Sequence, residues 1–157
     1  MLTLLIAATT TALGQDVNSY IELLRSDVKT QAREIITESM HFDEHDASAF
    51  WPIYRDYEFE LGKLGDARIA LIKEYAANYD SMTDKKAEEL MNKVMKFQED
   101  RLKLKKKYFK KIAKALSATT AAKFTQVDNE LQLLIDLQIA SQLPLVKKPT
   151  GKAEMKK

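Results

Sequence analysis

Cysteine is absent from this chain of 157 residues, and glycine and proline are scarce, with 4 and 3 occurrences. Without cysteine the protein has no disulfide, no thiolate nucleophile and no cysteine-based zinc site. Glycine and proline break helices, so their scarcity favours long uninterrupted helices over a turn-rich β fold. The absences therefore exclude several kinds of chemistry and favour an all-helical protein.

Neither sign of charge dominates, because 25 basic residues face 23 acidic ones and the net charge is +2. Such a balance, at 31% charged residues, is typical of a helical surface laced with salt bridges. We therefore expect no nucleic-acid partner. The longest apolar run, Leu2 to Ala8, is too short for a bilayer, and we expect no membrane span.

The first residues differ in character from the rest of the chain. The apolar run is followed by a small-x-small pattern at Ala12 and Gly14, which is typical of a signal-peptidase site before Gln15. The usual basic residue at the start of a leader is missing. We expect residues 1–14 to be a signal peptide and the protein to be periplasmic or secreted. The alternative is an apolar start on a cytoplasmic protein.

The remaining sequence contains four stretches of helical periodicity, at residues 17–39, 44–79, 83–116 and 117–143. In the two middle stretches apolar residues recur at heptad spacing, interrupted in the first of them at Arg68. We predict one all-α domain over residues 15–146, of about four helices, whose two long middle helices form an antiparallel amphipathic hairpin or cradle. Residues 147–157 are predicted to be a disordered lysine-rich tail.

Short polar residues precede three of these helices and predict their N-caps. Asp43 is the expected cap of the second helix, Thr83 or Ser81 of the third, and Ser117 of the fourth. Phe42 is expected to pack onto the first turn as a hydrophobic staple. Inside the second helix Pro52 removes a backbone hydrogen bond and is expected to kink the chain.

The densest aromatic cluster lies at residues 50–59. Phe50 and Tyr54 lie on the seam of the second helix, whereas Trp51 and Phe59 lie off it. One interpretation is an aromatic surface on which all four side chains bind partner proteins. The other, favoured by the seam for Phe50 and Tyr54, is the core of a helix bundle.

The third helix offers two further sets of candidate partner-binding residues. Met91 and Met95 flank its seam, and methionine adapts its shape to varied partners, although it also fills ordinary cores. Lys106 and Lys110 belong to a lysine-rich stretch at 103–114, interpreted either as a solvated helix face or as a basic rim around a client-binding surface. Membrane-surface binding is disfavoured because the seam already uses the apolar face.

His41 and His45 are four residues apart, a spacing at which two histidines on a helix share a divalent metal. The predicted start of the second helix falls between them, so the helical spacing is not expected to hold. A metal site at this pair is the minority hypothesis, and no other cofactor is expected. Since no nucleophile, general base or phosphate loop accompanies the pair, we expect no enzyme activity.

The repeated helix starts Leu116-Ser117-Ala118-Thr119-Thr120 and Met82-Thr83-Asp84-Lys85-Lys86 resemble the twice-occurring Leu-Thr-x-x-Gln motif of Spy/CpxP-like periplasmic stress proteins. The glutamine does not fall at the family position, and Gln126 follows later. The resemblance implies a helical cradle, often dimeric, that shields unfolding proteins without ATP, and related members bind metals.

Three functional hypotheses follow. The first is an exported, ATP-independent chaperone or envelope-stress adaptor that binds unfolded proteins. The second is a structural or regulatory module of the envelope with one dedicated partner, and the third is a metal-responsive periplasmic protein. An open hairpin leaves an apolar face that needs covering, so a homodimer is expected in each case.

Overall fold

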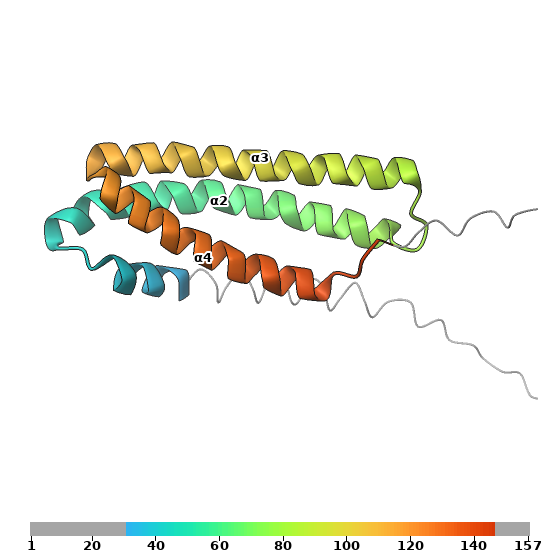
Figure 1. The fold of residues 1–157 in the computed structure, drawn as a ribbon, viewed down its shortest axis with the longest axis horizontal. Coiled ribbons are helices and arrows are strands. Elements are labelled where there is room, and N and C mark those ends of the chain that lie inside the picture. Colours follow the sequence, from blue (N-terminus) through green and yellow to red (C-terminus); the bar gives the residue numbers. More distant parts are fainter. Residues whose placement is uncertain (1–30, 147–157) are drawn as a thin grey trace, which may run out of the picture. The chain divides into compact units, whose positions relative to one another are not determined.

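The computed structural model describes residues 31–146. Residues 31–40 are helical, and they are followed by α2 (Glu44–Asn78), α3 (Asp84–Ala115) and α4 (Ala118–Gln142) (Figure 1). No strand occurs within residues 31–146, which confirms the all-α prediction. The predicted leader at 1–14, most of the first predicted helix and the tail at 147–157 lie outside the described residues.

The chain divides into two compact units after Ile35. Of the first unit only residues 31–35 are described, and they are helical. Everything below concerns the second unit, from Ile36 onward. No helix of the described part is long and apolar enough to cross a membrane.

Each of the three long helices begins at the cap that the sequence predicted. Each capping oxygen accepts a hydrogen bond from the backbone N–H three residues later: Asp43 from Asp46 at 2.7 Å, Thr83 from Lys86 at 3.2 Å and Ser117 from Thr120 at 3.0 Å. These bonds satisfy donors that the first turn leaves without a partner. Phe42 packs on Phe50 of the second turn, with ring centroids 4.6 Å apart, and not on the first turn as the staple prediction required.

α2 continues through Pro52 without a break. Proline lacks the N–H that would bond the carbonyl one turn earlier, at Ser48. Both residues are exposed, so water can satisfy that carbonyl. The helix therefore tolerates the proline on its solvent side.

α2 and α3 form the predicted antiparallel hairpin and lie side by side in Figure 1. Ion pairs between them fix the register: Glu60, near the middle of α2, contacts Lys107 at 2.6 Å, and Glu74, near its C-terminal end, contacts Lys93 at 2.8 Å. The turn between the helices buries Met82. Ion pairs that flank the apolar seam thus join the two helices of the hairpin.

The core is an aromatic cluster where α2, α3 and α4 meet. Phe50 and Tyr57 of α2 pack against Phe124 of α4, with ring centroids 5.3 and 5.6 Å apart. Tyr57 also meets Tyr108 of α3 at 5.2 Å. Each fully buried large side chain contributes about 1.5–3 kcal/mol, so this cluster anchors α4 on the hairpin.

Further along α4, ion pairs rather than aromatic rings connect this helix to the hairpin. Asp136 accepts hydrogen bonds from Arg68 of α2 at 2.6 Å and from Arg101 of α3 at 2.9 Å. Arg68, the charged residue that interrupts the predicted seam, thus binds α4 through Asp136. The two arginines are mostly buried, with 21% and 14% of their side chains exposed, so this clamp is better shielded from solvent than a surface ion pair.

Candidate functional site

Two of the predicted partner-binding aromatics are core residues. Phe50 is 0% exposed and Tyr54 is 5% exposed, so neither can contact a partner while the domain is folded. The prediction of a surface role for these two is wrong, because α4 covers the face of α2 that carries them. Trp51 is half-buried against Phe50 and Tyr54, and only Phe59, at 66% exposure, stands free in solvent with Lys63 over its ring.

The predicted residues on α3 are on the surface, but its methionines do not join Phe59. Met91, Met95, Lys106 and Lys110 are all exposed. The Glu60–Lys107 pair places Phe59 near the level of Tyr108, about 20 Å along the hairpin from Met95 at 1.5 Å per residue. The predicted set therefore separates into at least two surfaces.

Three exposed leucines on α4 were not among the predicted partner-binding residues. Leu133, Leu134 and Leu137 are 65%, 63% and 69% exposed. α4 has apolar residues on all sides, so periodicity alone could not tell the buried stripe at Phe124 and Leu131 from the exposed one. The missing signal was the position of the arginines that bind Asp136.

Exposed apolar side chains of α3 and α4 lie next to one another. The bonds of Arg101 to Asp136 and of Lys105 to Asn129 set an antiparallel register that brings Leu102 to the level of Leu133. Leu102 is 50% exposed. We name the resulting surface the distal apolar face; it consists of Met91, Met95, Leu102, Leu133 and Leu137.

Between α2 and α3 runs a groove of about 630 Å³. Its apolar lining comes from Leu64 and Leu71 of α2 and Phe97 of α3, with the small side chains of Ala67 and Ala70 beside them. Charged residues of both signs form the rim. The groove is open to solvent, which suits a polypeptide segment better than an enclosed small molecule.

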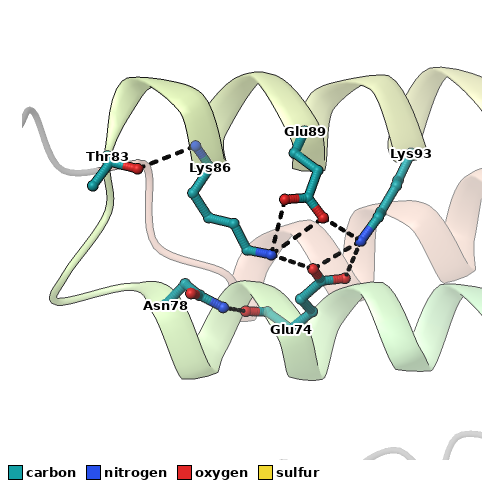
Figure 2. Close-up of polar contacts among 6 residues, drawn as sticks. All are labelled: Glu74, Asn78, Thr83, Lys86, Glu89 and Lys93. Atoms are coloured by element: carbon teal, nitrogen blue, oxygen red, sulfur yellow. Dashed lines mark hydrogen bonds and ion pairs between the residues drawn. The ribbon is translucent and has the colours of Figure 1, made fainter.

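One end of the groove is fixed by the charged network drawn in Figure 2. Glu74 of α2 accepts hydrogen bonds from Lys86 at 2.5 Å and from Lys93 at 2.8 Å, and Glu89 accepts from both lysines. These bonds lower the pKa of Glu74 to about 2. The network joins the ends of α2 and α3 at this end of the groove.

Asp128 is the single charged side chain buried within residues 31–146, at 4% exposure. It accepts a 2.7 Å hydrogen bond from the Tyr57 hydroxyl, and burial raises the pKa of its carboxyl. Burial likewise raises the pKa of Tyr57. Since the pair lies inside the aromatic core, it is a structural contact between α2 and α4.

The two histidines proposed as metal ligands are not on one helix. His41 precedes α2 and has a positive φ of 52°, so the helical spacing fails, as the sequence indicated. Ligand atoms of Asp43, His45 and Asp46 do lie within 4.8 Å of one another, but His41 is not among them. The Asp43 carboxylate already caps α2, which explains why these exposed groups gather.

Comparison with protein families, with curated proteins and with solved structures finds no match to this chain. The fold class consequently rests on the structure alone. The chain is an all-α protein whose helical hairpin carries a third long helix across one side.

Proposed function

We propose that this protein is an exported, ATP-independent binding protein for unfolded polypeptides, acting as a chaperone or envelope-stress adaptor. The observation that supports this most is the distal apolar face. Soluble proteins scatter single apolar residues over their surfaces, whereas a contiguous set of large ones marks an interaction site. Here α3 and α4 together present five such side chains, of which four are at least half exposed.

The chemistry of this face suits varied clients. Two of its members are methionines, whose flexible side chains adapt to different partner shapes. Covering five partly exposed side chains contributes on the order of 5–8 kcal/mol before the cost of association. The cost of association offsets much of this gain, so binding is weak and a client leaves without an energy source.

The direct test is suppression of aggregation. A chemically denatured reporter enzyme is diluted into buffer with increasing amounts of the protein, and light scattering is followed. We expect aggregation to be suppressed at a near-stoichiometric ratio without nucleotide. Unchanged scattering across a range of salt concentrations would contradict the proposal.

A second candidate, a structural or regulatory module with one dedicated partner, is supported by the groove. A groove between two helices fits a partner of one shape, whereas a surface rich in flexible side chains accepts many. Replacing Ala67 by Phe fills the groove and leaves the distal apolar face untouched. If this module is correct, A67F loses one specific partner in pull-downs from envelope extract but still suppresses aggregation as well as the wild type.

The predicted homodimer remains part of the proposal. A second copy would compete with clients for the distal apolar face, since burying apolar area drives both contacts. Sedimentation velocity of the wild type and of the variant L133S/L137S tests this. A dimer that persists in the variant uses another surface, and a wild-type monomer at every concentration contradicts the dimer.

A further inference from the structure

The outward side of α3 is strongly basic toward its C-terminal end. From Arg101 to Val127 the sequence contains no aspartate or glutamate. Within that stretch the lysines of α3 are Lys103, Lys105, Lys106, Lys107, Lys110, Lys111 and Lys114. The overall charge balance of the chain therefore conceals a local excess of positive charge.

Acidic residues elsewhere neutralise only some of these lysines. Lys107 pairs with Glu60 at 2.6 Å and Lys111 with Asp56 at 3.8 Å, both across the hairpin. Lys106, Lys110 and Lys114 make no ion pair with any residue of the described part of the chain. The free lysines point away from α2, so folding leaves their charge to an outside partner.

The three free lysines lie in successive turns of α3, beside two exposed apolar residues. They are spaced at i, i+4 and i+8, which places them on one side of the helix. Leu102 continues the row at i−4, and Phe109 lies one turn from Lys106. Both apolar side chains are accessible, Leu102 at 50% and Phe109 at 36%. We name Leu102, Lys106, Phe109, Lys110 and Lys114 the basic face of α3.

From the sequence, membrane-surface binding was disfavoured because the seam already uses the apolar face of the helix. The structure shows apolar residues of α3 outside the seam. The seam buries Leu104, Tyr108 and Ile112, but Leu102 and Phe109 remain on another side. Lysines beside exposed phenylalanine and leucine are the combination with which helices lie on anionic membranes.

We propose that the basic face of α3 docks the protein onto an anionic lipid surface. The lysine ammonium groups contact headgroup phosphates, while their methylene stems and the side chains of Leu102 and Phe109 enter the interface. Each lysine near such a surface contributes about 1 kcal/mol. The three free lysines together then raise membrane affinity by about a hundredfold.

The apolar members of the basic face favour a bilayer over an acidic polypeptide. The set from Leu102 to Lys114 is about 18 Å long at 1.5 Å per residue and turns through about 120° around the helix. Leu102, which also belongs to the distal apolar face, and Phe109 lie at one edge of this set, where they can enter a lipid interface while the lysines contact headgroups. Exposed Glu130 of α4 lies outside the row.

The test is sedimentation with vesicles of phosphatidylcholine, with and without phosphatidylglycerol. The variant K106Q/K110Q/K114Q is compared with K63Q/K73Q/K85Q, which removes the same charge from exposed lysines elsewhere. We expect the first variant to lose about a hundredfold in binding to the mixed vesicles and the control to keep wild-type binding. Pure phosphatidylcholine should bind none of the three proteins tightly.

The variant L102S/F109S separates docking from a purely ionic attraction. It should weaken binding to mixed vesicles about tenfold and leave binding to a poly-glutamate peptide unchanged. Equal losses in both lysine variants overturn the proposal, as does tighter binding of wild-type protein to poly-glutamate or duplex DNA than to mixed vesicles. These assays contain no unfolded client, so their outcome is independent of the aggregation test.

Discussion

The hydroxyl of Tyr57 in α2 donates a 2.7 Å hydrogen bond to the buried carboxylate of Asp128 in α4. The two residues are 71 positions apart in the chain, and their contact lies inside the aromatic core. Arg101 and Lys105 of α3 attract the carboxylate, but burial has the larger effect on its pKa. One polar contact thus fixes how α4 is seated among the aromatic rings.

We predict that Y57F lowers the free energy of unfolding by about 1–3 kcal/mol, because it removes the hydroxyl that donates a hydrogen bond to the buried carboxylate. D128N keeps the accepting oxygen and removes the buried charge, so its stability at neutral pH should equal or exceed that of the wild type by up to about 1 kcal/mol. Urea denaturation measures both values. If Y57F is as stable as the wild type, the hydrogen bond makes no net contribution to the free energy of unfolding.

The pH dependence of D128N gives a second prediction. Burial raises the folded-state pKa of Asp128 above its ordinary 3.8, so the folded protein binds this proton more tightly than the unfolded chain does. As the pH falls from above the folded-state pKa to 3.8, the wild type therefore gains stability relative to D128N. Urea titrations over this range should show the gain, and parallel curves would contradict it.

The contribution of Glu74 to stability should change with pH in the opposite direction to that of Asp128. Hydrogen bonds from Lys86 and Lys93 lower its pKa from 4.5 to about 2, so its stabilising effect is present above 4.5 and is lost as the pH falls toward 2. E74Q should consequently be less stable than the wild type at neutral pH, and the two should converge in acid. A constant difference at every pH would mean that the ion pairs of Figure 2 are not the cause.

The clamp on Asp136 allows a fourth test. D136N leaves Arg68 and Arg101 close together without a shared carboxylate, and we expect a loss of about 1–2 kcal/mol in unfolding free energy. D56N is the matched control, because Asp56 is 68% exposed and lies 3.8 Å from Lys111. Its change should stay within about 0.5 kcal/mol. Equal effects would place the clamp among ordinary surface pairs.

A matched pair of truncations tests whether Phe50 is a core residue and Phe59 a surface residue. F50A removes a fully buried ring and should cost about 3–5 kcal/mol, whereas F59A removes an exposed ring and should change stability by less than about 0.5 kcal/mol. Thermal or urea unfolding distinguishes them. A similar cost for both would contradict the placement of Phe50 in the core.

Local signals predicted the helices well. Capping residues such as Asp43, Thr83 and Ser117 act on the turn that follows them, so the start of each long helix was correctly predicted from neighbouring residues alone. The heptad spacing likewise predicted the hairpin, because it concerns one face of each helix. The sequence could not show which side of α4 is buried, since that depends on Arg68 and Arg101, more than thirty positions away.

The candidate surfaces depend on the same long-range information. Met95 and Lys110, two of the predicted partner-binding residues, are exposed, but Leu133 and Leu137 were not among the candidates. Their exposure follows from the ion pairs that seat α4, and these join residues far apart in the chain. Likewise, the sequence cannot show that Lys107 and Lys111 have acidic partners on α2 while Lys106 and Lys110 have no ion pair, because those partners are far away in the chain.

The most direct measurement of the central claim compares two variants in the aggregation assay. M95S/L133S/L137S makes the distal apolar face polar, and F59S/L145S/V146S makes the same number of exposed apolar residues polar elsewhere. Circular dichroism confirms that both remain helical. We expect the first variant to need at least about tenfold more protein for the same protection and the control to match the wild type. Full protection by the first variant would contradict binding of clients at this face.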